Sequence, residues 1–193
     1  FTNVVNLMDG LDGLAAGVAG IASITVILVA IQQGFYPVAV ITAALAGGIV
    51  GFMRYNFNPA TIFMGDTGSM FIGYMLAAIS IFGAVKSAAT IALIVPAIAL
   101  GLPIMDTAFA IVRRYTNGRP IFQPDKGHLH HRLLAMGMTQ RQAVLLMYII
   151  SAILGIAAVL LTEVGGYYAV IIIALIITAV VFGAKKIGIL NDR

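Results

Sequence analysis

The residues of this chain that could carry out polar chemistry fall in three short motifs. These are residues 6–13 (NLMDGLDG), 64–69 (MGDTGS) and 128–131 (HLHH), and long apolar runs separate them. Only 9% of the residues are charged, yet carboxylates and imidazoles gather at the ends of the apolar runs. This placement favours polar chemistry at a membrane surface.

The first motif places Asn6, Asp9 and Asp12 three residues apart. In a helix they would follow one drifting face, and in a turn Gly10 and Gly13 would supply the backbone freedom. Two close carboxylates disfavour joint ionisation unless a cation or a ligand rich in donors lies between them. Asp12 could instead cap the next helix, but capping explains only one of these side chains.

Asp66 lies between Gly65 and Gly68, just before an apolar run that starts near Ser69. An isolated Asp here would be an N-cap. The flanking glycines, however, allow a ligand to approach the backbone, and a helix N-terminus attracts anions. A hard oxygen ligand at such a place suits a phosphate bound to Mg²⁺.

Other polar and aromatic residues admit two interpretations each. Asn56 could hydrogen-bond a base and Phe63 could stack on it, although each alone is explained by packing. The spacing of the three histidines, His128, His130 and His131, is not that of a helical pair of zinc ligands. Because Lys126 and Arg132 lie nearby, the histidines resemble hydrogen-bond donors to a phosphate. The alternative is a solvated loop.

Asp106 lies inside an apolar run, where a charge usually has a partner. Arg113, seven residues later, shares its helical face. A structural ion pair is the first interpretation, and a share in the active site is the second.

Composition places the chain in the membrane. The sequence is 61% hydrophobic with a mean hydropathy of +1.06, and its apolar runs have about the length that crosses a hydrocarbon core. The basic residues flank these runs as topology determinants do, so the net charge of +4 does not indicate nucleic acid. The absence of cysteine excludes disulfides and thiolate chemistry.

We predict an all-α bundle forming one integral membrane domain over residues 1–193. Its six predicted spans are 14–31, 37–53, 69–85, 88–112, 143–161 and 167–184. Ten of the 11 Lys and Arg residues lie on one side of these spans and Lys86 alone lies on the other, which places the long loops and both ends in the cytoplasm. Pro96 and Pro103 predict a kink or break in the fourth span.

Taken together, the motifs resemble those of the polyprenyl-phosphate N-acetylhexosamine-1-phosphate transferases (glycosyltransferase family 4), which are bacterial integral membrane enzymes. The resemblance covers nearly the whole chain. It rests on residues 6–15 (NLMDGLDGLA), 57–60 (FNPA), 63–69 (FMGDTGS), and 103–107 (PIMDT) followed by Arg113 and Arg114.

The resemblance implies transfer of a sugar-1-phosphate from a UDP-sugar to a polyprenyl phosphate, with release of UMP, at the cytoplasmic face of the bacterial cytoplasmic membrane. It implies Mg²⁺, or Mn²⁺ in its place, and is compatible with a homodimer. Asp66 would ligate the metal. Asp9 and Asp12 would match the central acidic motif and be catalytic, as would the histidines, and Asp12 would also help Asn56 and Phe63 to hold the uridine. The implied substrate-binding residues are Asn6, Gly10, Leu11, Asn56 and Phe63, and the three histidines would contact the diphosphate or the sugar.

Residues 124–133 (PDKGHLHHRL) are similar to the N-acetylglucosamine-1-phosphate branch, which serves teichoic acid, O-antigen or related polymers. The alternative is the muramoyl-pentapeptide branch, which typically carries three consecutive histidines. In this chain Leu129 interrupts the histidines, which favours the N-acetylglucosamine branch. Two other classes of function are alternatives. A transporter would place its polar site near the midplane of the membrane, whereas a non-catalytic scaffold would tolerate substitution of the polar residues in the three motifs.

One element of the family pattern has no match in this chain, namely an adjacent Asp-Asp pair on an earlier helix. The chain starts at Phe1 inside a polar motif. We therefore expect a C-terminal part of a longer transferase that is inactive alone.

Overall fold

The structure, a computed structural model, describes residues 1–84, 89–116, 118, 120, 127–164, 168, 171–176, 178 and 182–183. Within these ranges the chain is helical and contains no strand, which confirms the predicted all-α class. The helices are α1 (Thr2–Met8), α2 (Leu14–Gln32), α3 (Tyr36–Asn56), α4 (Gly65–Ala84), α5 (Ala89–Ala99), α6 (Gly101–Thr116), α7 (Leu129–Ala135) and α8 (Gln140–Leu161).

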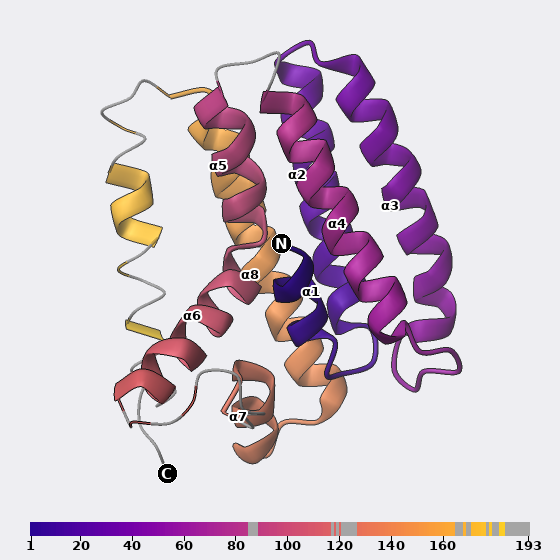
Figure 1. The fold of residues 1–193 in the computed structure, drawn as a ribbon, viewed down its shortest axis with the longest axis vertical. Helices are drawn as coiled ribbons and strands as arrows, with labels where there is room; N and C mark the ends of the chain where they lie inside the picture. The colour runs from indigo at the N-terminus through magenta and orange to yellow at the C-terminus, as the bar shows by residue number, and fades with distance from the viewer. Residues whose placement is uncertain are drawn as a thin grey trace.

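Four of the described helices, α2, α3, α4 and α8, are long and apolar enough to cross a membrane. They correspond to four of the predicted spans and lie side by side in one bundle (Figure 1). The count of six spans and the orientation of the ends remain predictions. Eight of the 18 residues of the sixth predicted span, 167–184, lie outside the described residues.

The fourth predicted span, 88–112, is broken at Leu100 into α5 and α6. Pro103 has no N–H for an intrahelical bond, and its ring crowds the preceding turn. The chain bends there, and α6 leaves the foot of α5 on a diagonal path toward α7 (Figure 1). The predicted break is confirmed, and it gives α6 a direction of its own that carries Asp106 to the site.

Small residues let the helices of the bundle approach closely. A side chain at Gly17 of α2 would collide with the ring of Tyr148 on α8, and one at Gly155 would collide with Thr25. The Tyr148 hydroxyl donates to the carbonyl of Gly13. This contact ties the first turn of α2 to α8 beside the acidic motif.

The short helix α1 packs against α4. Val5 and Met8 are buried, and a Cβ at Gly73 of α4 would lie 2.7 Å from the Cα of Thr2. This close approach brings the end of α1, which carries the acidic motif, beside the first turn of α4, which carries Asp66.

Candidate active site

Asn6 joins the first two motifs. Its amide Nδ2 donates to Asp66 Oδ1 at 3.0 Å and to Ser69 Oγ at 2.9 Å, which accounts for both amide hydrogens. Ser69 Oγ in turn donates to the carbonyl of Gly65 at 3.0 Å. Asp66 is exposed in the first turn of α4, where the helix dipole favours a negative charge.

Asp9 follows α1 and lies near Asp66. Burial raises the pKa of the Asp9 carboxyl, and the negative charge of Asp66 raises it further. A carboxyl whose ionisation is disfavoured by burial and by a neighbouring negative charge is the electrostatic pattern that a bound cation would relieve. The structure thus brings together Asn6, Asp9 and Asp66.

Asp12 does not cap α2. The N-cap residue is Gly13, with φ of 78° and no side-chain cap, so the capping interpretation is wrong. Asp12 Oδ2 instead accepts from Asn58 Nδ2 at 3.0 Å and from the backbone N–H of Ala60 at 3.1 Å. These bonds hold the carboxylate against the loop between α3 and α4.

Asn58 extends this network to α8. Its Nδ2 also donates to Gln140 Oε1 at 3.0 Å, and its carbonyl accepts from Arg141 Nε at 3.0 Å. Gln140 begins α8, whose Thr139 N-cap forms a capping box with Gln142. The position of Asp12 therefore depends on the start of α8.

Three of the residues expected to bind substrate, Leu11, Asn56 and Phe63, lie in different surroundings. Asn56 is buried, its Oδ1 accepts from Gly13 N at 3.1 Å, and its Nδ2 donates to the Ile62 carbonyl at 3.0 Å. Leu11 packs against the main core. Phe63 is 74% exposed and lines an apolar groove of about 620 Å³ between α3 and α4.

The histidine motif begins α7 and faces the acidic motif. His128 and His130 have parallel rings with centroids 5.9 Å apart, and the His131 ring lies 4.2 Å from that of His130. A Cβ at Gly10 would lie only 2.6 Å from His130 Nε2. The first and third motifs, residues 6–13 and 128–131, thus meet at Gly10.

His130 is neutral at physiological pH. Burial, and then the neighbouring His131, lower its pKa to about 4. Its side chain is 2% exposed, and its Nδ1 has no hydrogen-bond partner in the described part of the chain. A neutral imidazole offers one donor and one acceptor, so His130 contributes a dipole and not a full charge.

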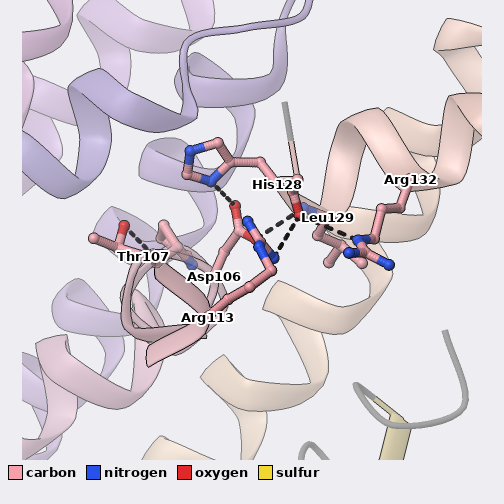
Figure 2. Close-up of polar contacts among 8 residues, drawn as sticks. Asp106, Thr107, Arg113, His128, Leu129 and Arg132 are labelled. Carbon is pink, nitrogen blue, oxygen red and sulfur yellow. Dashed lines mark hydrogen bonds and ion pairs between the residues drawn. The ribbon is translucent and has the colours of Figure 1, made fainter. Parts of the chain in front are cut away.

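Asp106 anchors the start of the histidine motif, as Figure 2 shows. Its Oδ2 lies 3.0 Å from His128 Nδ1, and its Oδ1 accepts from the Leu129 N–H at 2.8 Å. Arg113, the partner expected from helical spacing, donates from Nη1 to the carbonyl of Gly127 at 3.1 Å. Asp106 thus contacts a motif that lies 22 residues further along the chain.

The acidic cluster fits a magnesium ion shared with a phosphate. No group of three or more metal-ligating side chains gathers among the residues that the structure describes. Mg²⁺ is usually held by one or two carboxylates together with substrate phosphates and waters. The exposed Asp66 beside Asp9 supplies that kind of donor set.

Sequence reasoning missed the roles of several residues. Asn58 and Ser69 were parts of motifs, but nothing in their spacing indicated hydrogen bonds to Asp12 and Asn6. Tyr148 lies in an apolar run, and its contact with Gly13 joins residues 135 positions apart. Only the Thr139 capping box could be read directly, from the sequence TQRQ.

Comparison with known proteins places these features in a family context. Residues 1–84 match the family model described as Glycosyl transferase family 4. The whole chain is similar, at 42% identity over 192 residues, to a probable undecaprenyl-phosphate N-acetylglucosaminyl 1-phosphate transferase of Bacillus subtilis, covering 54% of that protein.

Two further relatives differ in their named substrates. A decaprenyl-phosphate N-acetylglucosaminephosphotransferase of Mycolicibacterium smegmatis is 44% identical over 76% of the chain and 39% of that relative. A phospho-N-acetylmuramoyl-pentapeptide-transferase of Clostridium botulinum is 38% identical over 79% of the chain and 45% of that relative. The chain spans about half the length of the curated relatives it matches.

Proposed function

This chain belongs to glycosyl transferase family 4, and we propose that the whole protein transfers N-acetylglucosamine-1-phosphate from UDP-N-acetylglucosamine to a polyprenyl phosphate. The reaction takes place at the cytoplasmic face of the membrane, since ten of the 11 basic residues lie on that side of the predicted spans. UMP is the second product.

One observation carries this proposal. Asn6 bonds to both Asp66 and Ser69, and Gly10 lies against His130, so three separate motifs form one polar site at the ends of apolar helices. Phosphoryl transfer needs positioning and charge neutralisation more than covalent chemistry by the protein. A site of carboxylates, imidazoles and a helix N-terminus supplies those functions.

In the proposed reaction, an oxygen of the polyprenyl phosphate attacks the phosphorus that carries the sugar. The bond from that phosphorus to the oxygen bridging the two phosphates breaks, and the bridging oxygen leaves with UMP. The new phosphoanhydride joins the lipid phosphate to the sugar phosphate. Bond formed and bond broken are of the same kind, so no oxidant or further reactant is required.

The residues take different parts in this proposal. Asp66, with Asp9 beside it, would hold Mg²⁺, which neutralises phosphate charge when bound. His128, His130 and His131 face the diphosphate as hydrogen-bonding groups. Phe63 offers an exposed ring on which the uracil stacks.

Asp12 and Asn56 play supporting parts. Asn56 shapes the loop that presents Phe63, because both ends of its amide bind backbone groups. Asp12 Oδ2 is occupied by the loop between α3 and α4, so Asp12 approaches the uridine through Oδ1.

The choice of N-acetylglucosamine as the sugar rests on the histidine motif and on the relatives. The relatives named for N-acetylglucosamine are 42% and 44% identical to this chain, against 38% for the muramoyl-pentapeptide relative. The donor assay separates the two branches, because each accepts a different UDP-sugar.

The test measures Mg²⁺-dependent UMP release by the whole protein in detergent, with UDP-N-acetylglucosamine and a polyprenyl phosphate. Asp66→Asn keeps the shape of the side chain and removes its charge, and we expect a loss of about 100-fold or more. Glu163→Gln is the matched control, since it also neutralises an exposed carboxylate and should leave the rate unchanged.

Three outcomes contradict parts of the proposal. Wild-type turnover by Asp66→Asn would refute the metal assignment. Release with UDP-muramoyl-pentapeptide alone would keep the chemistry and change the branch. No release with either donor would refute the transferase activity.

A further inference from the structure

Asp106 uses both of its carboxylate oxygens on the start of the histidine motif. It is 7% exposed, with Oδ2 at 3.0 Å from His128 Nδ1 and Oδ1 at 2.8 Å from the Leu129 nitrogen. One contact holds the side chain of His128 and the other holds the backbone directly after it. The carboxylate therefore restrains both the position and the rotation of the imidazole (Figure 2).

The first contact also fixes where His128 carries its proton. An ionised carboxylate only accepts hydrogen bonds, so Nδ1 must be the donor. The choice of protonated nitrogen is set by the hydrogen bond that the ring makes. Nε2 is then the nitrogen left for other partners, and Figure 2 shows the rest of the ring pointing away from Asp106.

The second contact stabilises α7. This helix has seven residues, and its N-cap residue, His128, makes no side-chain cap. The first N–H groups of a helix lack intrahelical partners, and Asp106 accepts from one of them across the tertiary structure. A negative charge at a helix N-terminus is also favourable.

The residue before His128 is held as well, by one side chain from α6 and one from α7. The carbonyl of Gly127 accepts from Arg113 Nη1 at 3.1 Å and from Arg132 Nε at 3.3 Å. Asp106 and Arg113, two turns apart on α6, thus hold the backbone on both sides of His128. The break at Leu100 directs α6 toward this segment.

The position of His128 is transmitted to the acidic motif through His130. The two rings are parallel at 5.9 Å with an interplanar angle of 6°, and His130 lies against Gly10. A rotation of His128 would therefore disturb the ring that contacts the acidic motif.

We propose that Asp106 is a positioning residue of the transferase, which holds His128 with its proton on Nδ1 and directs Nε2 toward the diphosphate of the donor. This inference rests on the proposed function for the identity of that ligand. The Asp106 and His128 geometry itself is independent of the reaction and is tested separately.

Asp106→Asn is the informative substitution, because it keeps the shape while reversing one hydrogen bond. An amide has one accepting oxygen and one donating nitrogen. If its oxygen accepts from the Leu129 N–H, its nitrogen faces His128 Nδ1, which must then accept, and the proton moves to Nε2. We expect kcat to fall about 10- to 100-fold, with KM for the UDP-sugar changed less than threefold.

A double-substitution cycle separates positioning from a general loss of structure. In a His128→Gln background the tautomer no longer exists, so adding Asp106→Asn should lower kcat less than twofold further. A full additional loss in that background would overturn the proposal, as would wild-type kcat in Asp106→Asn alone. Glu163→Gln again serves as the control for a lost carboxylate charge.

A spectroscopic measurement tests the geometry without any assay of activity. We expect ¹⁵N NMR of the histidine-labelled whole protein to show one ring with its proton on Nδ1 that disappears in His128→Gln and changes tautomer in Asp106→Asn. A His128 proton on Nε2 in the wild type would refute the inference. If this signal is present but UMP is never released, the proposed function fails and the assignment to a transferase site fails with it.

Discussion

Replacing Gly10 by alanine should displace His130 without altering the backbone. The φ of Gly10 is not positive, so alanine fits its conformation. The new Cβ would lie 2.6 Å from His130 Nε2, whereas an ordinary contact starts at 3.4 Å. The ring must therefore move by about 0.8 Å, and a misplacement of about 1 Å at an active site costs about 100-fold in rate.

The displacement of His130 should be visible in the rate of the reaction. His130 is 2% exposed, and its ring is parallel to that of His128 and tilted against that of His131, so its displacement disturbs the whole histidine cluster. We expect kcat for UMP release to fall 10- to 100-fold, which corresponds to about 1.4–2.7 kcal/mol in the activation barrier. Overpacking of this size should also destabilise the fold by about 1–3 kcal/mol.

The assay compares Gly10→Ala with Gly47→Ala in the whole protein. Gly47 is a helical glycine of α3 whose Cβ would meet nothing within 4 Å, so its substitution should leave kcat unchanged. A rise in KM with unchanged kcat would mean that the methyl group blocks substrate and does not move His130. A kcat within twofold of wild type would refute the packing of His130 on Gly10.

Two further predictions concern stability. Gly17→Ala should lower the free energy of unfolding by about 1–3 kcal/mol, because its methyl group collides with the ring of Tyr148. Thermal unfolding in detergent should show this loss for Gly17→Ala and none for Gly47→Ala; equal behaviour of the two variants would contradict the packing of α2 on α8. The second prediction follows from the pKa of His130, lowered by burial from 6.5 to about 4. At pH 5 the unfolded chain binds a proton that the folded chain excludes, so the free energy of unfolding should fall by about 2 kcal/mol between pH 7 and pH 5. His130→Leu should lack this fall, and an unchanged pH dependence in that variant would show that another group is responsible.

The sequence predicted the membrane helices well because apolar length is a local property. The predicted spans 14–31, 37–53 and 143–161 match α2, α3 and α8 within a few residues. The errors lie at the polar ends. Hydropathy marks where a helix leaves the hydrocarbon, whereas the helix itself continues as long as backbone bonds and caps support it. For this reason α4 starts at Gly65, four residues before the predicted start, and includes Asp66.

The site was predictable in its residue types and only partly in its contacts. The spacing of Asp9 and Asp12 and their nearness to glycines indicated a ligand site, but the two carboxylates have different surroundings. Asp9 lies near Asp66, and Asp12 is held by Asn58 and Ala60. These partners come from a loop about 46 residues away in the sequence, and no local pattern specifies them.

Asp106 shows the same limit for a buried charge. The rule that a charge in an apolar run needs a partner was sound, and periodicity suggested Arg113. The structure adds His128 and the Leu129 N–H as partners, because the break at Leu100 turns α6 toward α7. Two prolines indicated the break, but the direction of α6 after it depends on packing that the sequence does not state.

These contacts change how a loss of activity in the motifs should be interpreted. Asn56, Asn58 and Asp106 each bind groups of the protein itself, so substituting them should lower activity whether or not they contact substrate. A set of inactive variants therefore cannot distinguish a residue that contacts the diphosphate from one that positions its neighbour. The distinction requires cycles such as Asp106→Asn with His128→Gln, because a positioning residue loses its effect when the group it positions is removed, whereas a residue with its own contact to substrate does not.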